Sequence, residues 1–467
     1  MAELQHFGYF FSRGFGPQAW GRSDWDWGHD WTKPDLYQQS VRTLEQAGMD
    51  LVIAEDAVSL GSPATLDLRI RQAYGGPKHD PLLLAPYLFA ATSHIGIAPT
   101  VNAGITPPYL AARQFATLAH LSSDRLGINV VTDVGSARHA GLPPLPHDQA
   151  YDRAEEWITL LRRLWHSWGD AYVGAPDSWH FADGDALDAF HHEGAHFTAD
   201  GPLNALPLAS DPVVVSPGGS GRGLAFAGTH SDVQLALAPL SADAVTDYRA
   251  RVIAAAEAAG RSTADLRILF VLKPVIVSSP EEADRIVAAS EHPSDDALRA
   301  AAIAWSSDSE TDLLALDLDA PVPDGTFGEH VSAGTIRGLL GDTPDAPLRE
   351  LLTRKARQGR IRSRSGFVGT ADEFADFIEE LGSDADNDGI IFSGDLHPAQ
   401  IHRMLGDLVP VLRRRGLLRR EYGAGGIRGE PVRLLAGRLR ATASWTSWSR
   451  PASWTSSCRR PSSWTSS

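Results

Sequence analysis

Residues 95–133 read IGIAPTVNAGITPPYLAARQFATLAHLSSDRLGINVVTD. Two short apolar runs lie at the ends of this stretch and an amphipathic segment lies between them, which is the pattern of a strand, a helix and a parallel strand. The same alternation recurs along the chain and gives eight expected strands: Phe7–Phe11, Leu51–Glu55, Ile95–Thr100, Gly127–Thr132, Pro212–Ser216, Val233–Leu237, Ile268–Val277 and Gly389–Phe392. Eight strand–helix repeats allow a parallel sheet to close, so we predict an α/β fold of the TIM-type (βα)8 barrel class. An open doubly wound sheet is the alternative.

Two of the connecting segments have clear helical signals. Asp35–Ala47 has Pro34 at its entry and Gly48 at its exit, where a left-handed cap is expected. In Tyr151–Trp168 the large apolar residues recur at spacings of three and four, which indicates one buried face. We expect that face to pack on the barrel.

Three stretches interrupt the alternation, at about 11–32, 171–208 and 294–364. We interpret them as insertions over a single catalytic domain that spans residues 1–422. From Gly423 the composition changes, and Ser-Trp-Thr-Ser recurs at 444–447, 453–456 and 463–466. This low-complexity segment, 423–467, has no periodic apolar face and is predicted to be a disordered tail.

The composition excludes several classes of function. The net charge of −16 argues against nucleic acid and anionic membrane surfaces as partners, because both require clustered Lys and Arg. The first residues lack a basic segment followed by an apolar run, and no later run reaches the ~18 apolar residues that span a bilayer, so a cytoplasmic location is expected. The single cysteine, Cys458, lies in the tail, which removes disulfides, thiolate metal sites and cysteine nucleophiles from the catalytic body.

Six pieces of sequence occur in a fixed order: GYFFSRGFG at 8–16, DLVIAED at 50–56, the stretch 95–133, HDQAYDRAEEWITLLRRLWHSW at 147–168, GAHFTADGPLN at 194–204 and PVVVSPGGSGRG at 212–223. Together with FVGTADEFADFI at 367–378 and RRRGLLRREY at 413–422, they resemble the luciferase-like flavin monooxygenases. The resemblance is greatest to the branch that contains nitrilotriacetate monooxygenase, dibenzothiophene-sulfone monooxygenase and pristinamycin synthase. It implies a βα barrel that uses reduced FMN, supplied by a separate NAD(P)H-dependent flavin reductase, and O2 as co-substrate. We also expect a homodimer or a homotetramer.

The glycine-rich turn 216–223 is the predicted site for the FMN phosphate. A turn between a strand and a helix presents backbone N–H groups and the positive end of the helix dipole to an anion. We therefore assign Ser220 and Gly221 to the phosphate, with Arg222 as a candidate counter-charge. An ordinary glycine turn is the alternative, whereas a dinucleotide motif is disfavoured because the spacing is G-x-G-x-G.

The ends of strands two to four supply the other cofactor candidates, since barrel enzymes carry their working groups there. Glu55 follows strand two, and the resemblance implies that Thr100, Asn102 and Asn129 meet the flavin ring. It also implies that Tyr151 lies near the ribityl and phosphate groups. For each of these residues a purely structural role in a loop or helix start is the alternative.

One feature of strand three departs from the resemblance. The family's usual Ser-Thr-Thr is replaced here by Asn102-Ala103-Gly104, which puts this part of the pocket in doubt. Luciferase-like barrels often have a non-proline cis peptide near the flavin, and small residues ease such strain. We therefore expect a cis bond within 102–104, with an ordinary loop as the alternative.

His139 lies seven residues beyond Thr132 and is, with Asn129, the predicted catalytic residue, because a histidine can move a proton near neutral pH. The tryptophans in the loop after strand one either stack a planar substrate or simply cover the barrel end. They are Trp20, Trp25, Trp27 and Trp31.

No metal is expected. His191, His192 and His196 are interpreted as residues of the inserted loop. The spacing of Asp384–Asp395 matches a calcium loop in part, but Gly389–Phe392 is needed as strand eight.

The sequence thus predicts a two-component, FMN- and O2-dependent monooxygenase that oxidises a small, planar heterocyclic substrate in a catabolic pathway. A riboflavin-cleaving enzyme of the same family, an F420-dependent dehydrogenase on the same barrel and a non-catalytic flavin-binding protein remain as alternatives.

Overall fold

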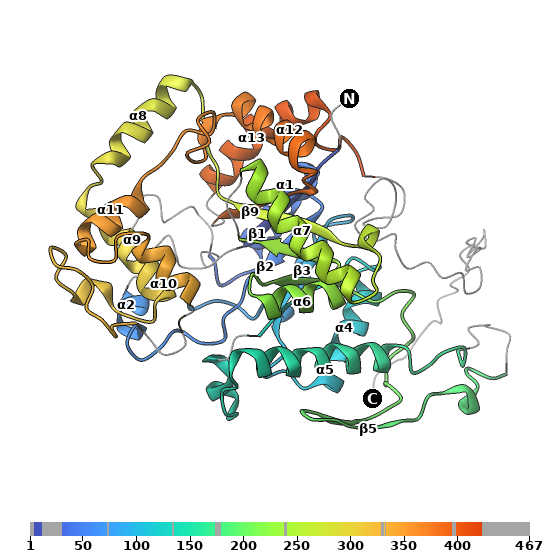
Figure 1. Cartoon of the computed structure of the whole chain (residues 1–467). Coiled ribbons are helices and arrows are strands. Elements are labelled where there is room, and N and C mark those ends of the chain that lie inside the picture. Colours follow the sequence, from blue (N-terminus) through green and yellow to red (C-terminus); the bar gives the residue numbers. More distant parts are fainter. Residues whose placement is uncertain are drawn as a thin grey trace, which may run out of the picture.

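The computed structural model describes residues 4–11, 30–71, 74–132, 135–172, 179–237, 241–327, 331, 333–394 and 398–422. Its centre is a closed barrel of eight parallel strands in the spatial order β1-β12-β9-β8-β7-β4-β3-β2 (Figure 1). The barrel strands are β1 His6–Phe11, β2 Leu51–Ala54, β3 Gly96–Asn102, β4 Gly127–Val131, β7 Val213–Pro217, β8 Val233–Ala236, β9 Arg267–Leu272 and β12 Gly389–Gly394. The predicted α/β barrel class is confirmed, with a barrel strand at each of the eight expected positions.

The helices lie outside the barrel sheet (Figure 1). They are α1 Asp35–Gln46, α2 Leu66–Arg71, α3 Pro81–Ala90, α4 Pro108–Leu121, α5 His147–Trp165, α6 Gly221–His230, α7 Ala242–Ala258, α8 Pro280–Glu291, α9 Asp295–Asp308, α10 Ala333–Leu340, α11 Leu348–Ala356, α12 Ala371–Ala385 and α13 Pro398–Arg415. Both helices singled out in the sequence are present. α1 is followed by Gly48 with φ +87°, and α5 buries Trp157, Leu161 and Trp165 against the core.

One expected strand was too long. The run 268–277 divides into β9 and a separate strand β10, Val275–Val277, which pairs outside the barrel with β11, Val368–Thr370. Pro274 lies between them and has no N–H to donate, so the barrel ladder cannot continue through it.

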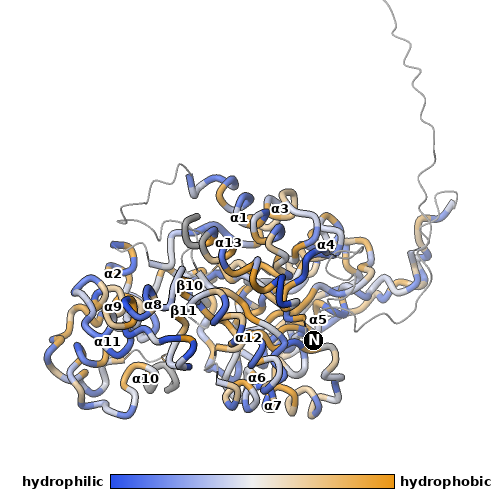
Figure 2. Tube along the Cα trace, turned by 90° about the horizontal axis from the view of Figure 1, so that it is seen from above, coloured by the Kyte–Doolittle hydropathy of each residue, from blue (hydrophilic) through white to orange (hydrophobic). Residues whose placement is uncertain are grey.

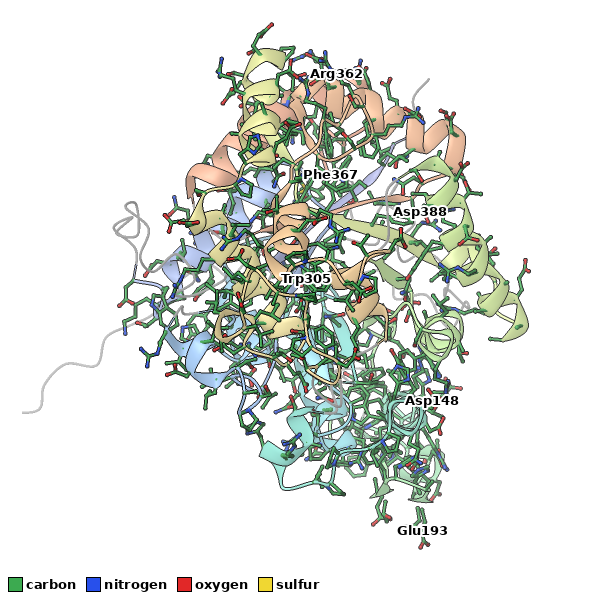
Figure 3. The ribbon with its side chains drawn as sticks, turned by 60° about the vertical axis from the view of Figure 1, so that its left-hand side comes forward. Asp148, Glu193, Trp305, Arg362, Phe367 and Asp388 are labelled. Atoms are coloured by element: carbon green, nitrogen blue, oxygen red, sulfur yellow. The ribbon has the colours of Figure 1, made fainter. Side chains whose placement is uncertain are left out.

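The insertions form separate structures around the barrel. Within 171–208, β5 His191–Glu193 and β6 Thr198–Asp200 make an antiparallel hairpin beyond α5. Figure 3 places Glu193 of this hairpin at the opposite end of the molecule from Arg362. Within 294–364, α9, α10 and α11 group to one side of the barrel (Figures 1 and 2). They share their own small core, which contains Leu298, Ala302, Leu313, Leu339, Leu348 and Leu352.

Two sequence predictions fall largely outside the described residues. Trp20, Trp25 and Trp27 lie outside them, and of the loop after strand one only its last residues, with Trp31, are described. The segment 423–467 also lies outside them, so the disordered tail and the 1–422 domain boundary stay predictions. In the part of the chain that the structure describes, no helix is long and apolar enough to cross a bilayer.

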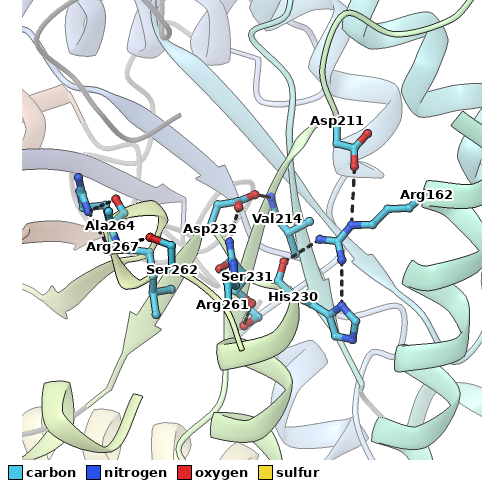
Figure 4. Close-up of polar contacts among 12 residues, drawn as sticks. Arg162, Asp211, Val214, His230, Ser231, Asp232, Arg261, Ser262, Ala264 and Arg267 are labelled. Atoms are coloured by element: carbon cyan, nitrogen blue, oxygen red, sulfur yellow. Dashed lines mark hydrogen bonds and ion pairs between the residues drawn. The ribbon is translucent and has the colours of Figure 1, made fainter. Parts of the chain in front are cut away.

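The amino end of the barrel carries a repeated arrangement. Asp50, Asp232 and Asp388 each directly precede a strand, and each carboxylate accepts the amide N–H of the second residue of the neighbouring strand, at 2.9–3.0 Å. Each of these carboxylates also forms an ion pair with an arginine: the partners are Arg419, Arg261 and Arg249, respectively. Figure 4 shows Asp232 with Arg261, beside Arg162 of α5, which contacts Asp211 and His230. These pairs tie adjacent strands and the outer helices together at one end.

Candidate functional site

The glycine-rich turn 216–223 joins β7 to α6 at the carboxyl end of the barrel. Ser220 caps the helix, because its Oγ accepts the amide N–H of Gly223 at 3.0 Å. A Cβ built on Gly219 or Gly221 would meet no atom within 4 Å, whereas one on Gly218 would lie 3.2 Å from the Gly223 Cα. Gly218 and Gly223 are therefore needed for close backbone packing, and Gly219 and Gly221 face open space.

The turn is braced from the barrel side. Gln234 Nε2 and the Tyr248 hydroxyl both donate to the Gly218 carbonyl, at 2.9 and 3.2 Å. In a trans peptide the next N–H points away from that carbonyl, so the amide of Gly219 is directed outward. Among the residues that the structure describes, no acceptor lies on the amides of Gly219, Gly221 or Arg222. The turn thus presents outward-facing donors at a helix N-terminus, the arrangement that binds phosphate.

The side chain of Arg222 is directed to α5 and not to the amides of the glycine-rich turn. Its guanidinium binds Glu155 and Asp152 of α5, at 2.8 and 2.6 Å, and the hydrogen bond to Glu155 is the main cause that raises the pKa of Arg222. The suggestion that Arg222 is a phosphate counter-charge is therefore not supported by its contacts. Its side chain fastens α6 to α5.

Two residues of α5 close the other side of the turn. The Tyr151 hydroxyl would lie 2.9 Å from a Cβ on Gly223 and is within hydrogen-bonding reach of Ser220 and Thr132, while burial raises its pKa. His147 Nε2 lies 3.4 Å from Ser220 Oγ, and its ring is 5.2 Å from that of Tyr151. The sequence analysis did not identify His147. His147 precedes Tyr151 by four residues on one helix, and this spacing would have indicated that both side chains lie on the same face.

Asn129 and Thr100 come together on neighbouring strands inside the barrel. Asn129 Nδ2 donates to Thr100 Oγ1 at 2.8 Å, and both side chains are buried. The other carboxamide atom, Asn129 Oδ1, is buried without a donor among the described residues. A buried acceptor without a partner is costly, so Asn129 Oδ1 is a candidate to accept a hydrogen bond from a ligand.

Asn102 has a local role at the end of β3. Its Oδ1 accepts the Gly104 amide at 2.8 Å, and its carbonyl accepts the amides of Ile105 and Thr106 at 3.2 Å. The cis peptides of the described residues are Gly76–Pro77 and Gly201–Pro202, so the bonds within 102–104 are trans and the expected cis bond there is wrong. Asn102 holds this turn by ordinary hydrogen bonds, which leaves no strain for small residues to relieve.

Glu55, at the end of β2, is paired with Lys78 from the α2–α3 connection at 2.5 Å, with both side chains mostly buried. Burial raises the pKa of the neighbouring Asp56 to about 6, and the negative charge of Glu55 adds to this, while Lys78 opposes it. Lys78 was missed because it lies 23 residues from its partner and no local pattern marks it.

His139 lies on the short 3₁₀ helix Gly135–Ala140 and is exposed. The structure does not bring it against Asn129. Ala137 of the same helix borders a hollow of about 320 Å³, a figure that includes the solvent at its opening. The hollow lies between the ends of β3 and β4 and the start of α5, and its lining includes Gly104, Thr132, Leu142, Pro143, Leu145 and Arg153.

The histidines of the hairpin have structural partners. His192 Nε2 lies 3.0 Å from Glu156 of α5, which also accepts the amides of His196 and Phe197, and His191 binds Asp200 at 2.6 Å. The described residues 384–394 of the calcium-loop candidate form the end of α12 followed by β12, as the strand assignment required.

Comparison with known proteins identifies the family. The model of the luciferase-like monooxygenases matches residues 15–384. The chain belongs to this family. The dibenzothiophene-sulfone monooxygenase of Rhodococcus erythropolis (strain XP) is 30% identical, over 91% of this chain and 95% of that protein. The nitrilotriacetate monooxygenase component A of Aminobacter aminovorans is 29% identical, over 86% of this chain and 90% of that protein.

Solved structures of luciferase-like and related enzymes have the same fold. A riboflavin lyase, solved with modified FMN and riboflavin, superposes with a TM-score of 0.74 at 25% identity, covering 91% of this chain and 95% of that one. The EDTA monooxygenase of Chelativorans sp. BNC1 gives 0.68 at 26% identity, covering 92% and 98%. The protein is therefore a flavin-dependent monooxygenase of the luciferase-like family, and its barrel is the family's.

Proposed function

We propose that the protein is the oxygenating component of a two-component system: it takes reduced FMN from a separate NAD(P)H-dependent flavin reductase and uses O2 to oxidise a small organic molecule. The observation that carries the proposal is the turn 216–223, whose outward-facing amides and open glycines suit a phosphate. A relative described as an FMNH2-dependent dimethylsulfone monooxygenase, 32% identical over 31% of this chain, supports the reduced state of the cofactor. A reductase that consumes reduced nicotinamide fits a cytoplasmic location.

The residues around the turn fit FMN. Ser220, Gly221 and the first amides of α6 would bind the phosphate, with Tyr151 and His147 beside it. The positive end of the α6 dipole adds to these contacts. Because Arg222 is already paired, we propose that backbone donors, rather than an arginine, carry this anion.

The ends of β2, β3 and β4 would hold the ring. Asn129 Oδ1, which has no donor among the described residues, would accept a hydrogen bond from a ring N–H, and Thr100 would orient that carboxamide. Glu55 would border the ring with its charge balanced by Lys78, and Asn102 would shape the backbone beside it through the turn to Gly104.

When bound, reduced flavin supplies the electrons that activate O2; the protein supplies orientation and excludes water. Asn129 is our candidate for the residue that sets the ring's position. His139 stays our candidate for moving a proton to or from the substrate, since its helix borders the hollow beside Thr132.

The substrate we propose is a planar heterocycle. Riboflavin cleavage is the second candidate, supported by the riboflavin lyase structure at 25% identity. An F420-dependent dehydrogenase is disfavoured, because the structural match to one is 15% identical, which indicates the fold alone, and because Arg222 is unavailable for a longer acidic tail.

One experiment separates these functions. The pure protein is supplied with FMN, NADH, a generic flavin reductase and air, and oxygen uptake and loss of candidate substrates are followed by mass spectrometry. We expect a heterocyclic substrate to gain oxygen only when the reductase is present. Loss of riboflavin alone would favour the lyase, and tight flavin binding without any turnover would contradict an enzymatic function.

A further inference from the structure

Arg153 of α5 is a half-buried cation without an anionic partner. Its guanidinium lies over the ring of Phe197, 4.6 Å from the centroid, and its Nε is buried without an acceptor. Among the described residues, no hydrogen bond or ion pair involves this side chain. Burial lowers the pKa of Arg153, and Glu156 only opposes that effect from a distance.

The nearby carboxylate is already committed to other groups. Glu156 accepts from His192 and from the amides of His196 and Phe197, so it fastens the hairpin to α5 rather than neutralising Arg153. A comparable arginine further along α5 is different: Arg163 lies 3.8 Å from the ring centroid of Phe190 and also pairs with Asp188. Among the described residues Arg153 therefore has no carboxylate partner, although the protein has a net charge of −16 and many carboxylates.

Arg153 lines the hollow beside the start of α5, where its unpaired guanidinium can meet a ligand. The hollow beside it is otherwise bordered by Gly104, Thr132 and apolar side chains, and among the described residues around it Arg153 alone is charged. Thr132 directly follows β4, and the Tyr151 hydroxyl, beside the phosphate turn, is within hydrogen-bonding reach of it. The hollow is therefore next to the proposed cofactor site but has its own, mainly apolar, wall.

We propose that Arg153 binds an acidic group of the substrate, a carboxylate or a sulfur oxyacid, while the apolar wall of the hollow holds the adjoining carbon skeleton. This inference rests on the proposed function and narrows its substrate class to planar compounds that carry one acidic group. A guanidinium matches a two-oxygen anion in bidentate geometry, and desolvation strengthens the contact. The hollow opens to solvent, so the acidic group would lie at Arg153 and the rest of the substrate would extend toward the flavin ring.

The test uses benzoate and benzenesulfonate as probes, with benzyl alcohol as the neutral analogue, on the full-length protein with and without oxidised FMN. We expect Arg153→Gln to weaken binding of both anions at least tenfold and Arg153→Lys to retain part of it. Binding of benzyl alcohol stays weak and unchanged in all variants. Arg163→Gln, which alters the other stacked arginine of the same helix, is the matched control and leaves anion binding unchanged.

The outcomes separate this inference from the proposed function. FMN affinity is measured on the same variants by fluorescence quenching, and we expect Arg153→Gln to leave it within about twofold. If FMN affinity falls in parallel with benzoate affinity, Arg153 belongs to the cofactor site and the inference is wrong. If Arg153→Gln lowers the melting temperature but the folded protein binds benzoate as before, the arginine is structural. If FMN does not bind to the parent protein while benzoate binding still depends on Arg153, the cofactor proposal fails and the anion site stands.

Discussion

Three aspartates at the amino end of the barrel and two residues at its carboxyl end differ in how their polar groups are satisfied. At the amino end, Asp50, Asp232 and Asp388 each bind a strand amide and an arginine. At the carboxyl end, Asn129 Oδ1 has no donor and Arg153 no anion among the described residues. The first arrangement completes its own bonds and stabilises the closed sheet, whereas the second leaves bonds for a ligand to complete. The contrast agrees with the TIM-type barrel, in which the amino face serves stability and the carboxyl face carries the active site.

The largest effect is expected from breaking an amino-end pair. Asp50→Ala leaves the buried Arg419 guanidinium and the Phe7 amide without their acceptor, so we expect a loss of about 3–5 kcal/mol of stability. Urea unfolding followed by tryptophan fluorescence measures it. Asp67→Ala is the control, since its pair with Arg71 is exposed and is worth about 0–1 kcal/mol. If FMN affinity of the folded Asp50→Ala protein also fell, the separation of the two ends would be wrong.

The second prediction concerns the carboxyl end. Gly221→Leu places a side chain in the open space before α6, so we expect FMN affinity to fall at least tenfold, about 1.4 kcal/mol or more, with an unchanged melting temperature. Gly228→Ala gives the opposite result: its Cβ would lie 2.5 Å from the Ala255 backbone, so stability falls and FMN affinity stays. Fluorescence titration and thermal unfolding of both variants measure the contrast. Unchanged flavin affinity in Gly221→Leu would remove the phosphate assignment.

The sequence predicted the barrel because its strands are local apolar runs, each recognisable without its neighbours. It also placed Ser220 and Gly221 on one turn, since a strand, a glycine turn and a helix start follow one another there, and the family resemblance placed Tyr151 near the phosphate. What it could not predict depends on residues far apart in the chain. Lys78, which pairs with Glu55, lies in the connection between α2 and α3. Glu156 binds the hairpin and so does not pair with Arg153. The role of an aspartate before a strand, such as Asp50, can be recognised only when its arginine partner is known.

A third prediction uses pH to test the carboxyl end. The pKa of Asp56 is raised to about 6 from 3.8, chiefly by burial, so the folded protein binds this proton more tightly than the unfolded chain. This group's contribution to stability is therefore greatest below pH 4 and is lost as pH rises from about 4 to about 6.

Replacing the Asp56 carboxyl tests this loss of stability at neutral pH. Asp56→Asn is expected to match the parent near pH 4 and to exceed it at pH 7 by about 1–2 kcal/mol, which is the shift of about two pKa units discounted for partial exposure. Unfolding midpoints across pH 4–8 measure the difference. Asp30→Asn is the control of opposite sign, because hydrogen bonds from Thr32 lower the pKa of Asp30 and its contribution is lost as pH falls. A stability difference that does not change with pH would show that Asp56 is ordinarily solvated.

The smallest effect is expected at Asn102, which lies at the carboxyl end but has completed its bonds as the amino-end residues do. Asn102→Ala removes the bond from Oδ1 to the Gly104 amide, so we expect a loss of about 1 kcal/mol of stability and a fall in FMN affinity below about threefold. Asn129→Ala is the matched variant. Its Oδ1 already lacks a donor, so we expect FMN affinity to fall by more than its stability does. Thermal unfolding and FMN titration measure the loss of stability and the loss of FMN affinity in each of the two variants. A larger flavin effect at Asn102 than at Asn129 would mean that position along the strand, rather than an uncompleted hydrogen bond, marks the residues that meet the cofactor.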